Sequence, residues 1–119
     1  ADCIQLEDQV SPKRCGHFSG KEVISTEEAV SKIKAAVDAR QDANLLIMAR
    51  TDAAAIHGFD AAVERAQAYA EAGADLLFVE AVTSAEHIAA LPQRLMTLHL
   101  PEWVTLWQAH EPKPGARLI

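Results

Sequence analysis

The stretch NLLIMARTD, residues 44–52, decides the fold, because five consecutive apolar residues end abruptly at Arg50, Thr51 and Asp52. A strand that carries apolar side chains on both faces is covered on both faces, which is typical of a parallel sheet. We therefore expect a buried central strand over residues 44–49, with its carboxyl end at the three polar residues.

Two shorter apolar runs flank this strand along the chain and end in the same way. Residues 3–6 lead into Glu7 and Asp8, and residues 76–79 lead into Glu80. Both runs are long enough for short strands. The sequence therefore predicts three strands whose carboxyl ends all carry ionisable side chains.

Helical patterns separate the predicted strands. Ser25 and the glutamate three residues later form a capping box that opens the first helix. Asp60 is the expected N-cap of a second helix that ends at Gly73. A third helix starts near Ser84, and Pro92 limits or bends it. The apolar positions expected to face the core are Ala29, Val30, Ile33, Ala36, Val37, Ala62, Val63, Ala66, Tyr69, Ala70, Ile88, Leu91 and Leu95.

The alternation of strands and helices predicts right-handed βαβ units and a parallel sheet. The spacing of Asp2 and Glu7 recurs at Asp75 and Glu80, which suits a repeating barrel better than an open sheet. A (β/α)₈ barrel needs roughly 250 residues, whereas this chain has 119. We expect an α/β fragment of a (β/α)₈ TIM-type barrel with about three to four β/α units, beginning in the middle of a unit.

The amino-acid composition disfavours some classes of binding partner. The formal net charge is −6 and the pI is about 5.3, which disfavours nucleic acid and an anionic membrane surface. No apolar run reaches the ~20 residues that span a bilayer, and no signal peptide is visible. Two cysteines give no disulfide framework. We expect a reduced, cytoplasmic protein, with Cys3 buried as a small hydrophobe.

Ionisable residues at the ends of the three predicted strands are the first candidates for a functional site. In a barrel, the carboxyl ends of the parallel strands form one rim, and that rim holds the active site. Glu7, Asp8, Arg50, Asp52 and Glu80 are therefore candidate site residues. The alternative is that each residue ends its strand only because the chain meets water there.

Positive charge is concentrated in the loop after the first strand, SPKRCGHFSG. Lys13, Arg14 and His17 lie within two residues of Cys15, and nearby cations stabilise a thiolate. Gly16 lets the backbone turn and approach a ligand closely. The thiol is therefore a candidate nucleophile or proton donor, and the cations are a candidate clamp for carboxylates or phosphates.

Three other interpretations of this loop are possible from the sequence. A solvated basic loop with an incidental cysteine requires no site. A zinc site needs further paired ligands, and Cys15-Gly16-His17 is a single C-x-H. A papain-like hydrolase has no other support in the chain. The remaining histidines show no ligand spacing and are expected at the surface: His57, His87, His99 and His110.

Four motifs taken together resemble one known family. They are residues 7–9 (EDQ), 12–17 (PKRCGH), 49–52 (ARTD) and 78–81 (FVEA). Their order and spacing over residues 1–95 resemble the isocitrate lyase/phosphoenolpyruvate mutase superfamily. The closest branch is that of the methylisocitrate and dimethylmalate lyases, whose relatives are often labelled carboxyvinyl-carboxyphosphonate phosphorylmutase. The cysteine loop marks the lyases within the family.

The resemblance implies a carbon–carbon lyase that uses Mg²⁺ or Mn²⁺. Retro-aldol cleavage of a 2-hydroxy di- or tricarboxylate, such as 2-methylisocitrate or dimethylmalate, would give pyruvate plus a carboxylic acid. Cys15 would protonate the carbanion, and Glu7 would belong to the metal's surroundings through water. Full-length relatives are implied to be homotetramers. Arg50 and His17 are implied to bind the substrate carboxylates and the developing charge, and Glu80 to help shape the substrate site. The substrate-binding residues that the resemblance implies are Lys13, Arg14, Gly16, His17, Arg50 and Glu80.

Two departures from the family pattern limit this interpretation. The family's principal metal-binding aspartates lie upstream of Ala1, and residues 96–119 fit no family element, which a frameshift or divergence would explain. We expect residues 1–95 to form a partial barrel and the chain alone to lack activity. The alternatives are a non-catalytic remnant or interaction module of the family, and an oxaloacetate decarboxylase or phosphonate-processing member.

Overall fold

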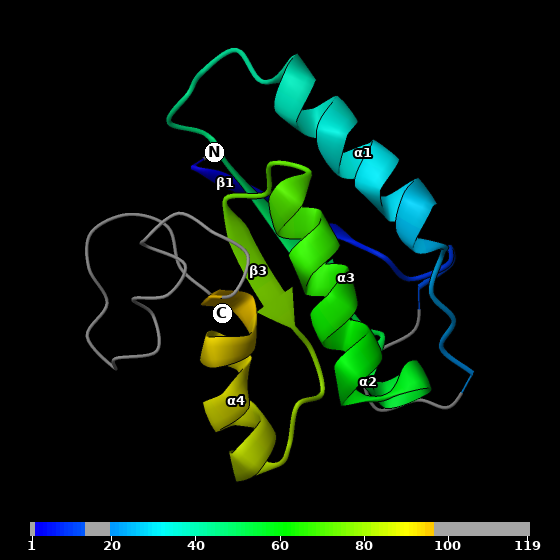
Figure 1. Ribbon diagram of the computed structural model, residues 1–119. Coiled ribbons are helices and arrows are strands. Elements are labelled where there is room, and N and C mark those ends of the chain that lie inside the picture. The colour runs from blue at the N-terminus through cyan, green and yellow to red at the C-terminus, as the bar shows by residue number, and fades with distance from the viewer. Residues whose placement is uncertain (1, 14–19, 97–119) are drawn as a thin grey trace.

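The computed structural model describes residues 2–13 and 20–96, which form three strands and four helices (Figure 1). Strands and helices alternate along the chain, with one additional short helix after the second strand. The strands are β1 (Cys3–Glu7), β2 (Leu46–Thr51) and β3 (Leu76–Val79), and the helices are α1 (Thr26–Ala39), α2 (Ala54–His57), α3 (Phe59–Glu71) and α4 (Ala85–Met96).

The strands form one parallel sheet in the order β1-β2-β3. The register aligns Glu7 with Arg50 and Arg50 with Phe78. Helices α1 and α3 pack against each other and against the strands, as Figure 1 shows. The prediction of an α/β fold with parallel strands is therefore confirmed. The register also brings the carboxyl ends of all three strands to one edge of the sheet.

The core lies between the sheet and the helices. Alternate residues of β2 face this layer, and Ile47, Ala49 and Thr51 are fully buried there. Helix α1 begins as the capping box predicts, because the Ser25 hydroxyl accepts a hydrogen bond from the Glu28 amide at 3.1 Å. The remaining core comes from the predicted stripes of α1 and α3, from β3 and from Leu91 and Leu95 of α4, which are also buried.

Three helix predictions were wrong in detail. The N-cap of α3 is Gly58 rather than Asp60, because the short helix α2 ends at this glycine and α3 begins from it. Asp60 lies in the first turn instead, where a negative charge faces the positive end of the helix dipole. Pro92 does not limit α4, which continues to Met96, and the alternative that Pro92 bends the helix stays a prediction. Ile88 is 49% exposed although it shares a helix face with the buried Leu91 and Leu95, because it lies in the first turn of α4, at the end of that face.

The strand predictions hold with small shifts. Strand β2 begins at Leu46, because the Asn44 amide donates to the Asp42 carboxylate in a turn that precedes the strand. Cys3 is only partly buried, so the prediction of a buried cysteine was wrong. This partial burial, together with the charge of Asp75, raises the pKa of the Cys3 thiol.

An ion pair closes the amino edge of the sheet. Arg40, which follows α1, donates to the Asp75 carboxylate at 2.6 Å and to the Leu45 carbonyl at 2.8 Å. The same carboxylate accepts the Ile47 amide at 2.9 Å, so Asp75 joins the start of β3 to the start of β2. This pair fixes the end of the sheet opposite to the candidate site.

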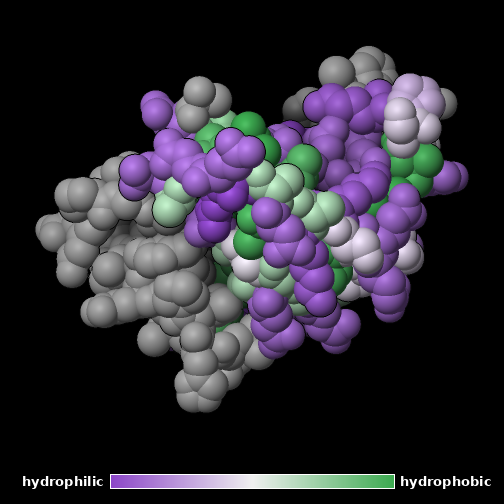
Figure 2. All heavy atoms as spheres, turned by 90° about the horizontal axis from the view of Figure 1, so that it is seen from above, coloured by the Kyte–Doolittle hydropathy of each residue, from purple (hydrophilic) through white to green (hydrophobic). Residues whose placement is uncertain are grey.

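One face of the molecule is mostly polar among the described residues. Figure 2 views the molecule from above and shows hydrophilic side chains over most of this face, with small apolar areas between them. No helix among residues 2–13 and 20–96 is long and apolar enough to cross a membrane.

Candidate functional site

Ionisable side chains gather at the carboxyl ends of the three strands. We call Glu7, Arg50, Asp52 and Glu80 the carboxyl-end rim. Arg50 Nε lies 3.6 Å from Glu7 Oε2, and the Arg50 guanidinium lies 5.4 Å from the centre of the Phe78 ring. The Glu80 amide donates to the Thr51 carbonyl at 3.0 Å, which holds the end of β3 beside the end of β2. The structure thus brings together four of the five strand-end residues that the sequence singled out, and Asp8 is the exception.

Arg50 is held by the aspartate two residues further on. Its Nε and Nη2 donate to the two carboxylate oxygens of Asp52 at 3.0 and 2.9 Å. Bidentate pairs of this kind fix the guanidinium plane as well as its position. The hydrogen bond with Asp52 raises the pKa of Arg50, so its positive charge is permanent.

Asp52 is a fully buried carboxylate with two cationic partners. Besides Arg50, it accepts a hydrogen bond from Lys21 Nζ at 3.0 Å. Burial alone would raise the pKa of Asp52, but the hydrogen bonds and charges of Arg50 and Lys21 outweigh burial and lower it. Asp52 is therefore ionised, and two segments of the chain meet on its carboxylate.

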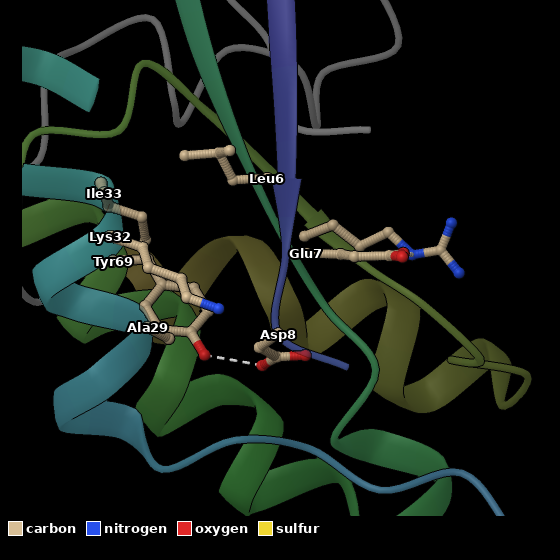
Figure 3. A pocket seen from close by; sticks show the side chains of 8 residues that line it. Leu6, Glu7, Asp8, Ala29, Lys32, Ile33 and Tyr69 are labelled. Atoms are coloured by element: carbon tan, nitrogen blue, oxygen red, sulfur yellow. Dashed lines mark hydrogen bonds and ion pairs between the residues drawn. The ribbon is translucent and has the colours of Figure 1, made fainter. Parts of the chain in front are cut away.

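Glu7 faces the opposite side of β1 from its neighbours. Figure 3 shows Leu6 and Asp8 on one side of the strand and Glu7 on the other. Glu7 Oε1 pairs with the exposed Lys13 ammonium at 3.2 Å. Glu7 Oε2 is buried and accepts no hydrogen bond within the described part of the chain. A buried carboxylate oxygen of this kind is suited to accept a hydrogen bond from a water or a ligand.

These donors fit a supporting role toward a metal ion rather than a complete site. Oxygen donors are what Mg²⁺ prefers, and the free oxygen of Glu7 provides one. Among residues 2–13 and 20–96, however, no group of three histidine, cysteine, aspartate or glutamate side chains could hold a metal ion. Glu7 can therefore contribute to the surroundings of a metal, and the remaining ligands would have to come from elsewhere.

Asp8 makes a buried network on the helix side of β1, next to a small pocket between β1, α1 and α3 (Figure 3). Its carboxylate accepts the Tyr69 hydroxyl at 2.6 Å and Arg65 Nη1 at 3.2 Å. The other oxygen accepts the Asp52 amide at 2.9 Å. Burial, followed by the hydrogen bond to Asp8, raises the pKa of Tyr69. Asp8 thus fixes the end of β2 and does not face the carboxyl-end rim.

Both ends of the cysteine loop lie beside this site. The Val10 amide donates to the Glu22 carbonyl and the Ile24 amide to the Asp8 carbonyl, each at 2.8 Å. Gln9 and Val23 form an antiparallel bridge between them. The predicted site residues Arg14, Cys15, Gly16 and His17 lie outside the described residues, and their roles stay predictions.

Sequence reasoning missed three members of the site. Tyr69 was expected only in an apolar stripe, and Lys21 and Arg65 were not singled out. An arginine four residues before a tyrosine on one helix face was a usable signal for a shared polar partner. Lys21 gave no local signal, since its partner Asp52 is 31 residues away along the chain. His57 and His87 are exposed as expected, and the His87 ring stacks on Phe59.

This fold and site define a segment of a (β/α) barrel with its ionisable side chains at the carboxyl ends of the strands. The family model for phosphoenolpyruvate phosphomutase matches residues 1–113. The chain therefore belongs to the phosphoenolpyruvate mutase/isocitrate lyase superfamily, as the motifs predicted.

The comparisons with known proteins point mainly to lyases. The chain is 62% identical over 80 residues to 2-methylisocitrate lyase of Shewanella oneidensis, an alignment that covers 67% of the chain and 27% of that protein. A crystal structure of 2,3-dimethylmalate lyase matches with a TM-score of 0.77 and 34% identity, covering 98% of this chain and 42% of that one. The chain thus spans well under half the length of either relative.

A third comparison concerns a metal. The crystal structure of phosphonopyruvate hydrolase in complex with oxalate and Mg²⁺ matches with a TM-score of 0.68 and 29% identity, covering 99% of this chain and 44% of that one. A member of this group of structures is therefore known as a magnesium complex.

Proposed function

We propose that the chain provides part of the active site of a carbon–carbon lyase. The reaction is retro-aldol cleavage of a 2-hydroxy di- or tricarboxylate, such as 2-methylisocitrate or 2,3-dimethylmalate, to pyruvate and a carboxylic acid. The observation that carries the proposal is Arg50, a guanidinium with a permanent charge that is held rigidly at the carboxyl ends of the strands. The names of the similar lyases support the same reaction class.

The reaction places defined demands on the protein. The substrate hydroxyl loses its proton to solvent and becomes a carbonyl, the carbon–carbon bond breaks, and its electron pair moves to the carbon next to a carboxylate. Cys15 returns one proton to that carbon. The thiol that protonates this carbon regains a proton from solvent, so that no proton is gained or lost over the cycle. Arg50 and His17 bind the carboxylates and the developing negative charge. Lys13, Arg14, Gly16 and Glu80 complete the surroundings of the substrate.

A magnesium ion, or manganese in its place, is part of the proposal. When bound, it would polarise the oxygen that becomes the carbonyl. Glu7 would lie in its surroundings and act through water, consistent with its free buried oxygen. Among the described residues, three cations and three carboxylates make up this group. The cations are Arg50, Lys13 and Lys21, and the carboxylates are Glu7, Asp52 and Glu80. An anionic substrate therefore needs additional positive charge, which a divalent cation provides.

The test is an assay of the protein expressed from its complete reading frame. We expect Mg²⁺-dependent release of pyruvate from 2-methylisocitrate or 2,3-dimethylmalate, and a loss of at least about 100-fold in kcat/KM for Cys15→Ser and Arg50→Met. Lys34→Met, on the exposed face of α1, is the matched control and should keep full activity. Turnover of phosphonopyruvate or oxaloacetate in place of both hydroxy acids would overturn the lyase assignment. So would an inactive protein.

The cellular setting belongs to the same proposal. The acidic pI and the small anionic substrate suit a cytoplasmic enzyme with no nucleic-acid or membrane partner. A homotetramer is proposed from the family resemblance. Size-exclusion chromatography with light scattering on the protein from the complete reading frame tests the tetramer directly.

A further inference from the structure

Lys21 is a buried lysine at the edge of the site. Its side chain is 4% exposed and its ammonium lies 3.0 Å from Asp52 Oδ1, which is itself fully buried. Lysine is rarely buried to this extent unless it is paired. It follows the cysteine loop directly, in a segment whose backbone is already held by the hydrogen bond between Val10 and Glu22. Because this hydrogen bond already holds the two ends of the loop together, closing the loop does not require a buried charge.

The partner of Lys21 is the carboxylate that holds Arg50. Asp52 Oδ1 receives Lys21 Nζ at 3.0 Å and Arg50 Nη2 at 2.9 Å, so the two cations share one oxygen. The Asp52 backbone is fixed separately, by the hydrogen bond from its amide to Asp8. Removing Lys21 would therefore alter the charge around Arg50 more than the position of Asp52.

The charge balance around Arg50 depends on this lysine. Asp52, Glu7 and Glu80 all act on Arg50, and Lys21 and Lys13 are the cations paired with the first two. With Lys21 present, these six groups carry no net charge. Without it, the group is net negative and repels an anionic ligand, because like charges a few ångströms apart interact strongly in a partly buried site.

We propose that Lys21 is a positioning residue: it neutralises Asp52, so that the permanently charged Arg50 is not surrounded by excess negative charge and keeps the orientation needed to bind a carboxylate. The inference rests on the proposed function only in naming the ligand as a substrate carboxylate. Lys21 does not touch the ligand. It acts through Asp52 on Arg50, and its charge rather than its shape carries the effect.

The test measures binding of oxalate, used as a dicarboxylate probe with Mg²⁺ present, by calorimetry on the protein from the complete reading frame. Lys21→Met should weaken oxalate binding about tenfold or more. Lys21→Arg should bind within about threefold of the original protein, because it keeps the charge. The double variant Lys21→Met/Asp52→Asn should bind oxalate more tightly than Lys21→Met, since removing both charges restores the balance. A purely structural role predicts no such recovery.

A second measurement is independent of ligand and activity. The ¹³C resonance of the Asp52 carboxyl should titrate at a higher pH in Lys21→Met than in the original protein, and Lys34→Met should leave it unchanged. Equal oxalate binding by Lys21→Met, no recovery in the double variant, or equal titration of Asp52 would each overturn the inference. If Lys21→Met does not fold, the double variant and Lys21→Arg still decide it, because weak oxalate binding by both refutes a role for the charge.

These results separate the inference from the proposed function. If the protein releases no pyruvate from either hydroxy acid, the proposed lyase activity fails, while oxalate binding and the Asp52 titration still report on Lys21. If pyruvate is released but Lys21→Met binds oxalate as tightly as the unmodified protein, only the inference fails.

Discussion

Replacing Tyr69 by phenylalanine removes two hydrogen bonds from the network behind the carboxyl-end rim, the one that the hydroxyl donates to Asp8 and a longer one that it accepts from Arg65 Nη1 at 3.3 Å. The Tyr69 hydroxyl donates to Asp8 at 2.6 Å, and both residues are only 1% exposed. Phenylalanine fills nearly the same volume, so the packing of the ring in the core is kept. Asp8 retains its hydrogen bonds with Arg65 and with the Asp52 amide.

The expected loss of unfolding free energy is about 2 kcal/mol, because a hydrogen bond to a buried charged acceptor contributes roughly 1.5–3 kcal/mol. Urea unfolding followed by circular dichroism at 222 nm measures it, and the midpoint should fall by about 1 M. A double-mutant cycle with Asp8→Asn should give a coupling energy of about 1 kcal/mol or more. A loss below about 0.5 kcal/mol for Tyr69→Phe would refute the claim that this hydrogen bond holds the site together.

Three further predictions concern the rest of the fold. The pKa of Asp52 is lowered in the folded state, so its ionised form stabilises the fold at every pH above the ordinary aspartate pKa of about 3.9. This contribution is lost as the pH falls through the folded-state pKa. The unfolding free energy of Asp52→Asn, measured in an acid titration, should therefore fall less steeply with pH than that of the unmodified protein. Gly73→Ala should cost about 1 kcal/mol more than Gly58→Ala, because both have a positive φ but only at Gly73 would the new methyl meet an α1 side chain, at 3.2 Å; equal losses of thermal stability would contradict this. Arg40→Met should lower the unfolding free energy by about 1–3 kcal/mol, because it leaves the Asp75 carboxylate at the amino edge with fewer partners, and oxalate binding should stay unchanged.

The parts of the fold that follow from local pattern were predictable. Strand β2 was visible because its apolar run ends abruptly at Arg50, and the start of α1 was visible because Ser25 opens a capping box. Gly73 was expected after α3 and has the positive φ typical of that position. In each case the deciding residues are neighbours in sequence.

The start of α3 was not predictable in the same way. Asp60 is a good N-cap by residue type, but Gly58 takes that position because the short helix α2 ends there. Local propensity favours both residues, and only the path of the chain after β2 chooses between them. The same holds for Ile88, whose exposure depends on how α4 lies against α3.

The candidate site was predictable as a location and not as a network. Parallel register alone brings Glu7 next to Arg50, so the carboxyl-end rim follows from recognising the strands. The choice of partner within it does not. Lys21 and Lys13 flank the same loop, yet one is buried on Asp52 and the other is exposed beside Glu7. Sequence spacing gives no reason to prefer either pairing.

Glu7 and Asp8 show how one strand end serves two purposes. Successive residues of a strand point to opposite faces, so two adjacent carboxylates meet different surroundings. Asp8 is enclosed by Tyr69 and Arg65 and fixes the Asp52 amide. Glu7 has one buried oxygen that is ion-paired with Arg50 and accepts no hydrogen bond from the described residues. The Asp52 carboxylate then holds Arg50 and Lys21 on a backbone that Asp8 has already fixed. The Asp8 carboxylate therefore determines where the charged groups of the site lie. Substitution of Asp8 should disturb oxalate binding, although Asp8 faces away from the carboxyl-end rim.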